Sequence, residues 1–328
     1  MDTTIQKDRD IDMNVLVTGS HGYIGSVLCK ELTETGHTVY ACDNKQVLGG
    51  DFRFIKCVYK ESFEEDRVIQ MILINDIQTI FHLAASSLLG PSATDPLLYY
   101  WNNTAKTITF LHKLASVGWK GHIIFSSTAA VYGDQPDPVT ETSALNPCNH
   151  YGKSKLVCEH ALSIANMYGI KTTVFRYFNV AGAFDDIGQD SGEPHIISRI
   201  CNAALHPDAP LTIFGSDYPT ADGTCIRDYL HVRDVCRAQI HAMDNDVMGT
   251  YNLGTFQGTS TRTLVELFKE INNVRVPSVY GPRREGDPTF LVANPKKFVD
   301  TGFEYKYSNT PYILASAWHY YKGKYNGF

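Results

Sequence analysis

The sequence predicts an α/β fold in which a doubly wound parallel sheet is followed by a smaller mixed α/β domain. Short apolar runs alternate with helical segments through the first half of the chain, a pattern typical of a parallel sheet covered by helices on both faces. After about residue 180 the chain changes to loops rich in Gly, Pro, Asp and Tyr, with shorter elements between them. We therefore expect a flexible extension at residues 1–12, the sheet domain at residues 13–180 and the smaller domain at residues 181–328, with room for later segments to return to the first sheet.

Each strand of the first domain is predicted from a run of apolar residues bounded by polar residues or glycine. These runs are residues 15–18, 37–42, 52–58, 79–83, 122–126 and 172–178. Helices are predicted between them, at residues 23–35, 63–75, 96–117 and 151–168, and in the last of these apolar side chains recur at helical spacing. Shorter elements are expected at residues 196–205, 232–243, 262–272 and 311–321.

Composition narrows the class of protein. The chain has 328 residues, of which 43% are hydrophobic and 20% charged, as in an ordinary globular protein. Its formal net charge of −6 argues against general binding to nucleic acid or to a membrane surface. No apolar run approaches the roughly 18 residues of a membrane span, and residues 1–12 lack the apolar core of a signal peptide. The eight cysteines show no metal-ligand spacing, so we expect reduced thiols, no metal site and a cytoplasmic location.

A glycine-rich turn follows the first predicted strand. Residues 15–18 run directly into Gly19-Ser20-His21-Gly22-Tyr23-Ile24-Gly25, and a helical segment follows. Glycines at this spacing allow a tight turn and a close backbone approach to a diphosphate, which the N-terminus of the helix attracts. Asp43 ends the second strand, eighteen residues after Gly25. Unless Asp43 is an ordinary surface residue, its carboxylate would bind a ribose 2′-hydroxyl and repel a 2′-phosphate, which predicts NAD rather than NADP.

A tyrosine and a lysine form a candidate general base. The fifth strand ends in Ser126-Ser127-Thr128, and Tyr151 is followed four residues later by Lys155, so both would share one face of a helix. An ammonium ~4 Å from the phenol contributes roughly 4 kcal/mol at an effective dielectric of ~20, enough to lower a tyrosine pKa by a few units and give a base poised near neutral pH. Tyr320 and Lys324 have the same spacing, but they follow no strand and lie in a short polar tail. We interpret that second pair as solvated surface.

With these residues in place, the chain resembles the extended short-chain dehydrogenase/reductase superfamily and, within it, the UDP-glucose 4-epimerases. The resemblance spans nearly the whole chain. Besides the glycine-rich turn, it rests on ordered segments at residues 125–133 (FSSTAAVYG), 151–155 (YGKSK), 176–179 (RYFN), 214–220 (FGSDYPT), 222–229 (DGTCIRDY), 251–254 (YNLG) and 283–287 (RREGD). It implies a Rossmann domain that binds NAD, followed by a domain that binds a UDP-hexose.

The resemblance implies a reaction at C4 of the sugar. Tyr151 would remove the 4-hydroxyl proton while hydride leaves C4 for the nicotinamide, Lys155 would hold the nicotinamide ribose and tune Tyr151, and Thr128 would bridge the 4-oxygen to the phenol. The resulting 4-ketone would turn over and take hydride back on its opposite face. UDP-glucose and UDP-galactose would thus be interconverted, in galactose metabolism, without net oxidation.

The resemblance also implies two sets of binding residues. NAD would contact Gly19, Gly22, Tyr23, Ile24, Gly25, Asp43, Asn44, Val58, Leu83, Ala84, Ala85, Asn102, Ser126, Ser127, Tyr151, Lys155 and Tyr177. The UDP-sugar would contact Thr128, Tyr151, Asn179, His195, Ile196, Phe214, Arg227, Tyr229, Arg284, Asp287 and Leu291. Among these, Arg227 and Arg284 would pair with the diphosphate, Asn179 with the diphosphate or a nearby ribose, and Asp287 with the uridine ribose. Tyr177 would pack on the nicotinamide or serve as a core tyrosine.

Two departures from the family pattern concern the cofactor and the sugar. Only about seven residues separate Asn44 from the next predicted strand, and Val58 stands where relatives commonly place an aspartate that binds adenine. We therefore expect NAD to exchange more readily here than in relatives. Leu291 corresponds to the residue that walls the pocket beside C2 of the hexose, and its intermediate size predicts efficient use of UDP-glucose and UDP-galactose with weaker activity on UDP-N-acetylglucosamine. Simple core packing of Leu291, with Phe290 as the wall, is the alternative.

Other activities of the superfamily are less well supported. A 4,6-dehydratase places Asp-Glu directly after the threonine, where this chain has Ala129 and Ala130, which cannot transfer protons. A decarboxylase or reductase is less firmly excluded, although Val180-Ala181-Gly182-Ala183 favours the epimerase pattern. A metabolite sensor without activity would not need Tyr151 and Lys155. The family's fold also predicts a homodimer through the helices at residues 96–117 and 151–168.

Overall fold

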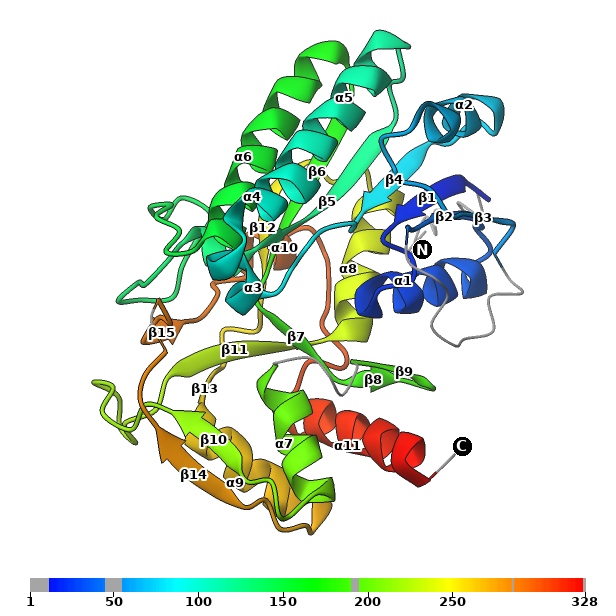
Figure 1. Cartoon of the computed structure of the whole chain (residues 1–328). Coiled ribbons are helices and arrows are strands. Elements are labelled where there is room, and N and C mark those ends of the chain that lie inside the picture. The colour runs from blue at the N-terminus through cyan, green and yellow to red at the C-terminus, as the bar shows by residue number, and fades with distance from the viewer. Residues whose placement is uncertain (1–11, 45–54, 190–194, 285, 327–328) are drawn as a thin grey trace, which may run out of the picture.

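A computed structural model describes residues 12–44, 55–189, 195–284 and 286–326 (Figure 1). Figure 1 shows a large sheet that runs through the upper part of the molecule, and a second lobe below it that carries α7, α9 and α11. The polypeptide enters the large sheet first and builds the second lobe mainly from residues after Tyr177. No helix within the described ranges has the length and apolar character needed to cross a membrane.

The large sheet has seven parallel strands in the order β12-β6-β5-β4-β1-β2-β3. Their bounds are β1 Asn14–Thr18, β2 Thr38–Cys42, β3 Cys57–Tyr59, β4 Thr79–His82, β5 His122–Thr128, β6 Lys171–Tyr177 and β12 Gly249–Leu253. The order reverses between β1 and β4, which is the arrangement of a doubly wound sheet. The fold class predicted from the sequence is therefore confirmed. The last strand, β12, returns from the second half of the chain to pair with β6.

Helices cover both faces of this sheet. One face carries α1 (Tyr23–Glu34), α8 (Val232–Asp244) and α10 (Lys296–Val299), and the other carries α2 (Asp66–Ile74), α5 (Lys106–Ser116) and α6 (His150–Ala165). Side chains alternate between the two faces, so Val15 and Val17 pack toward α1 and α8 while Leu16 packs toward α2 and α5. All three are fully buried, which explains why β1 reads as a continuous apolar run.

The second lobe has its own core between three helices and short sheets. Helices α7 (Ile196–Leu205), α9 (Thr261–Asn272) and α11 (Thr310–Asn326) pack around buried residues such as Ile200, Phe268 and Leu314. Strand β10 (Leu211–Phe214) pairs with β14 (Ser278–Gly281). Strand β11 (Ile226–His231) pairs with β7 (Asn179–Ala181), β13 (Gly258–Ser260) and β15 (Phe290–Leu291), and a hairpin joins β8 (Ala183–Phe184) to β9 (Ile187–Gly188).

The helix predicted at residues 96–117 is instead broken into several pieces. Helices α3 (Leu89–Thr94) and α4 (Pro96–Tyr99) precede a π-helical turn at Tyr100–Ala105, and α5 follows. In this turn the amide groups of Asn102 and Asn103 both bind Ser86, at 3.2 Å to its hydroxyl and 2.8 Å from its backbone N–H. A regular α-helix would set adjacent side chains about 100° apart, so the wider turn accompanies this shared contact.

Other predicted element boundaries differ from the observed ones by a few residues. The interpretation of Tyr320 and Lys324 as part of a short polar tail was wrong. The helix predicted from residue 63 begins at Asp66, and the third strand is only Cys57–Tyr59, while residues 45–54 of the expected short loop and strand lie outside the described ranges. Tyr320 and Lys324 do not lie in a short polar tail, because α11 continues to Asn326 and both residues line the large cleft described below.

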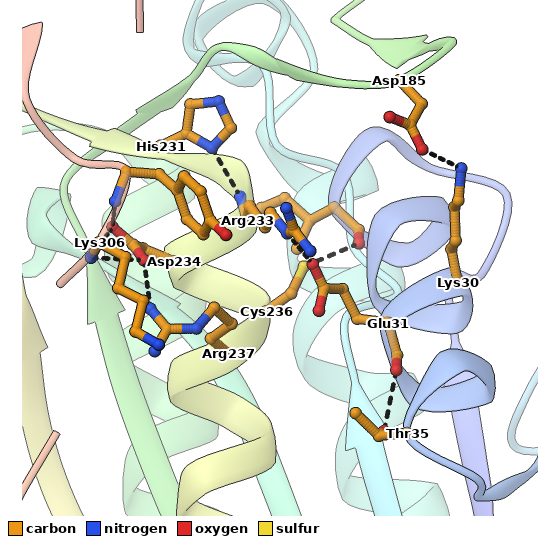
Figure 2. A network of polar contacts seen from close by, with 12 residues as sticks. Lys30, Glu31, Thr35, Asp185, His231, Arg233, Asp234, Cys236, Arg237 and Lys306 are labelled. Atoms are coloured by element: carbon orange, nitrogen blue, oxygen red, sulfur yellow. Dashed lines mark hydrogen bonds and ion pairs between the residues drawn. The ribbon is translucent and has the colours of Figure 1, made fainter. Parts of the chain in front are cut away.

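Charged residues fasten α1 to the elements beside it (Figure 2). Glu31 pairs with Arg233 of α8, whose guanidinium lies 4.1 Å from the ring centre of Phe184. Lys30 binds Asp185 at 2.5 Å. On the far side of α8, the fully buried carboxylate of Asp234 accepts hydrogen bonds from three successive backbone N–H groups, at residues 306–308. The contacts of Phe184 and Asp185 hold the segment that follows Asn179 beside α1, while Asp234 binds residues 306–308 to α8.

Candidate active site

One cleft of about 1530 Å³ opens at the carboxyl end of the large sheet, where the strand order reverses. Ligands of doubly wound folds bind at this position. Most of the residues predicted to bind cofactor or substrate line it. They are Gly19, Gly22, Tyr23, Ile24, Gly25, Asp43, Asn44, Leu83, Ala84, Ala85, Asn102, Ser126, Ser127, Thr128, Tyr151, Lys155, Tyr177, Asn179, His195, Arg227, Asp287 and Leu291.

The glycine-rich turn is shaped for close backbone contact. Gly19 has a φ of +72°, and a Cβ there would lie 2.8 Å from the backbone nitrogen of Ala84. A Cβ on Gly25 would lie 2.1 Å from the carbonyl oxygen of Gly19, so α1 can approach the turn only because residue 25 has no side chain. No side chain caps the N-terminus of α1, which leaves its first N–H groups directed at the cleft. This cradle fits the diphosphate of a dinucleotide.

Asp43 is buried and hydrogen-bonded to the glycine-rich turn, so it is not an ordinary surface residue. Its side chain is 8% exposed, and its Oδ2 accepts a hydrogen bond from the backbone N–H of His21 at 3.0 Å. The carboxylate is thus fixed at the end of β2, at the edge of the cleft, where an adenosine ribose would lie. The side chain of Val58, on the neighbouring strand β3, lies outside the described part of the structure.

Lys155 and Thr128 flank Tyr151 at the end of β5. Asn149 caps α6 by accepting a hydrogen bond from the N–H of Gly152 at 2.8 Å, which places Tyr151 in the first turn. The Thr128 hydroxyl is hydrogen-bonded to the Tyr151 phenol. Lys155 is 2% exposed, and its Nζ donates to the carbonyl oxygen of Ser126 at 2.7 Å. Each polar atom of this group is therefore tied to the same strand end.

Burial dominates the ionisation of both groups. It raises the pKa of Tyr151 to about 12, against a smaller lowering by the bond from Thr128. It also lowers the pKa of Lys155 to about 8. The expectation of a phenol poised near neutral pH is therefore wrong for the protein alone. The physical reason is that the loss of water penalises the charged phenolate, and the hydrogen bond with Thr128 offsets this penalty only in part.

The opposite end of the cleft carries an ion pair. Arg227 binds Asp287 at 2.6 Å, and the amide of Asn179 donates to the backbone carbonyl of Asp228 at 3.0 Å. Leu291 pairs with Arg227 through β15 and faces the cleft. These side chains can present a guanidinium, an amide and a carboxylate to a nucleoside diphosphate.

Four residues predicted to contact the substrate do not line the cleft. Arg284 lies 3.9 Å from the ring centre of Phe214, and this stacking holds both side chains beside β10. Tyr229 lies in the core of the second lobe, and Ile196, the first residue of α7, is partly buried against that core.

Several residues around Tyr151 were not anticipated from the sequence. The ring of Tyr99 packs edge-on against that of Tyr151, with centroids 6.4 Å apart, and its hydroxyl donates to the carbonyl of Leu88. The amide of Asn103 bridges the Ser86 backbone and the Ser154 hydroxyl on α6. These contacts join segments distant in the sequence, so no spacing pattern reveals them. The sequence offered one indication for Asn103, because its neighbour Asn102 was predicted to contact NAD.

Comparisons with known proteins agree with this geometry. Residues 15–254 match the model of the NAD dependent epimerase/dehydratase family. A curated UDP-glucose 4-epimerase of Lactobacillus helveticus is 37% identical over 96% of this chain and 99% of its own length. A crystal structure of UDP-glucose 4-epimerase from Brucella ovis in complex with NAD is 36% identical and superposes with a TM-score of 0.87, over 94% of this chain and 98% of that one.

A second solved structure is UDP-glucose 4-epimerase with UDP-glucose from Thermotoga maritima, which is 31% identical with a TM-score of 0.83 over 95% of this chain and 100% of that one. The predicted resemblance and the prediction of NAD as cofactor are confirmed. The chain belongs to the NAD dependent epimerase/dehydratase family.

Proposed function

We propose that this chain interconverts UDP-glucose and UDP-galactose by NAD-dependent epimerisation at C4. The observation that carries the proposal is the position of Tyr151, Thr128 and Lys155 in the same cleft as the glycine-rich turn, with Arg227 and Asp287 at the other end. The three relatives described above are UDP-glucose 4-epimerases, which supports the same substrate.

The cofactor would be held by the backbone of the glycine-rich turn, the carboxylate of Asp43 and the residues at the ends of β4 and β5. When bound, NAD supplies an acceptor and donor of hydride for C4 of the sugar. The chain itself supplies the proton chemistry. Tyr151 accepts the proton of the 4-hydroxyl as the 4-ketone forms and returns it when the alcohol is restored. Thr128 holds the 4-oxygen in line with the phenol.

A phenol with a pKa of about 12 must become more acidic before it can act as a base near neutral pH. Lys155 provides a positive charge whose position is fixed by the Ser126 carbonyl. The binding of a ligand that adds positive charge beside the phenol would then favour the phenolate over the phenol, because a nearby opposite charge stabilises the ionised form.

Epimerisation also requires the sugar to present both faces to the same hydride acceptor. Arg227 and Asp287 would anchor the nucleotide at one end of the cleft, and the hexose would rotate about its link to the diphosphate. An anchored nucleotide with a mobile sugar distinguishes this site from one that fixes its substrate rigidly.

The proposal is tested by incubating the purified protein with UDP-galactose and, separately, with UDP-glucose, and resolving the products by chromatography. Both reactions are expected to reach the same mixture of UDP-glucose and UDP-galactose, and the amount of oxidised NAD in the solution should not change. Absence of interconversion after NAD is supplied would contradict the proposal.

We further propose a homodimer and a cytoplasmic location. Large apolar side chains are exposed along the neighbouring helices α4 to α6, among them Leu97 (78%), Trp101 (62%) and Ile164 (55%), and Figure 1 shows α5 and α6 side by side on the outside of the sheet. An apolar face formed by two helices is suited to pack on the same face of a second copy. The seven cysteines whose side chains the structure describes are free thiols, as in a reducing compartment.

A further inference from the structure

A buried polar network lies behind the end of β5, and the chemistry proposed above does not use it. The hydroxyl of Ser127 donates a hydrogen bond to Glu159 of α6. Glu159 accepts two further bonds from Arg176 of β6, at 3.1 Å from Nε to Oε1 and 2.7 Å from Nη2 to Oε2. All three side chains are buried, so this is an ion pair in a dry environment with a hydroxyl attached to it.

The same network reaches the outer strand of the sheet. Arg176 Nη1 donates to the Tyr132 hydroxyl at 2.8 Å, which donates in turn to Asn252 Oδ1 of β12 at 2.7 Å. The N–H of Asn252 donates to Glu141 at 2.7 Å. The strands β5, β6 and β12 and the helix α6 are thereby joined through one chain of polar contacts.

Ser127 stands between the two residues that hold the proposed base and its lysine. The carbonyl of Ser126 accepts the bond from Lys155, and the hydroxyl of Thr128 binds Tyr151. Ser127 directs its hydroxyl toward Glu159, so this bond links the network to the segment that carries both contacts. A shift of Ser127 would move Ser126 and Thr128 with it.

A buried ion pair contributes little net stability, because desolvation of the two charges offsets their attraction. Its value lies in fixing one geometry where the alternative packings of apolar side chains would allow several. We propose that Glu159, held by Arg176, is a positioning residue for the epimerisation, and that it acts through Ser127 to fix the end of β5 under Tyr151 and Lys155. This inference rests on the proposed function.

The informative variant is Ser127→Ala. Glu159→Gln would leave Arg176 buried without a counter-charge and is expected to destabilise the whole fold. Ser127→Ala removes the side-chain hydrogen bond between Glu159 and β5, and it leaves the ion pair and the backbone pairing of β5 with β6 intact. We expect kcat to fall about tenfold, since small misplacements of reacting groups are costly, while KM for UDP-galactose stays within about twofold. Because Ser127 also lines the cleft, the assays are run at saturating NAD.

Thr173→Val is the matched control. Thr173 lies fully buried on β6 at the opposite end of the same strand pair, where its hydroxyl is hydrogen-bonded to His122 at 2.7 Å. This variant should lower the melting temperature but keep kcat within about twofold of the wild type. A merely structural role of Ser127 would make the two variants alike.

Three results would overturn the inference. The kcat of Ser127→Ala could lie less than about threefold below that of the wild type, or KM for UDP-galactose could rise while kcat stays unchanged. The kcat of Thr173→Val could also fall as much as that of Ser127→Ala. Turnover of UDP-galactose by the wild type is measured first. Its absence would overturn the proposed function, whereas an active wild type with a fully active Ser127→Ala variant would overturn the positioning role alone.

Discussion

Tyr151 and Lys155 are both driven toward their neutral forms by burial, in opposite directions on the pH scale. The pKa of the phenol rises to about 12 and that of the ammonium falls to about 8. Both side chains belong to α6 and line the cleft, but the attraction of ~4 kcal/mol expected from their four-residue spacing does not include the cost of removing water. Without bound ligands, the phenol of Tyr151 is therefore expected to stay protonated near neutral pH.

Replacing Tyr151 by phenylalanine removes the proton acceptor while keeping the aromatic wall of the cleft. We expect kcat to fall by at least ~10²-fold, the usual scale for loss of a general base, with binding of the UDP-sugar retained. Stopped assays with UDP-galactose give kcat, and calorimetric titration with UDP gives binding. Turnover close to that of the wild type would remove Tyr151 from the mechanism.

Leu291 lines the cleft beside Arg227 and is 8% exposed, so a change in its size alters the space available to the sugar. Leu291→Tyr should lower the ratio of UDP-N-acetylglucosamine to UDP-glucose turnover, and Leu291→Ser should raise it, because overpacking a tight pocket costs about 1 to 3 kcal/mol. Both sugars are assayed side by side for each variant. If neither substitution changes the ratio, Leu291 is core packing, as the alternative interpretation held.

At the scale of elements, the strands were easier to predict than the helices between them. A central strand such as β1 is buried on both faces, so its apolar run is local information that the sequence displays directly. The π-helical turn at Tyr100–Ala105 depends on Ser86, and the stacking of Arg284 on Phe214 depends on how two distant loops meet. Such contacts leave no periodic signal. The motifs therefore located the cleft but not every side chain that reaches it.

The exposed apolar face of α4 to α6 leads to a prediction about assembly. Wild-type protein at micromolar concentration should scatter light as a dimer, and Trp101→Glu should shift the mass toward the 36.6 kDa of one chain, because a buried unpaired charge opposes association. Met248→Glu, at an apolar residue 52% exposed beside β12, serves as the control and should leave the mass unchanged. A wild-type mass near 36.6 kDa would reject the dimer.

On the scale of the whole molecule, several buried histidines resist protonation. His82 on β4 is 1% exposed, with Nδ1 hydrogen-bonded to the Thr18 hydroxyl at 2.8 Å and Nε2 to that of Thr107 at 3.0 Å. Burial, with a smaller effect of Lys155, lowers the pKa of His82 to about 3. Burial also lowers the pKa values of His122 and His231, each to about 4.

These histidines make the fold sensitive to acid, and the sign follows from the direction of the shift. An unfolded histidine has a pKa near 6.5, so below about pH 6.5 the unfolded chain takes up a proton that folded His82 refuses until about pH 3. The contribution of His82 to the free energy of unfolding is therefore complete above about pH 6.5 and falls by about 1.4 kcal/mol per pH unit as the pH drops through about 5.

His82→Gln should lower stability near pH 7, because a glutamine amide cannot reproduce both hydrogen bonds, but the stability of this variant should decline less steeply toward pH 5. Urea unfolding followed by circular dichroism at about pH 7, 6 and 5 measures both slopes, with the exposed His160→Gln variant as control. Parallel slopes for wild type and His82→Gln would show that His82 becomes protonated in the folded state well above pH 3 and would overturn this account.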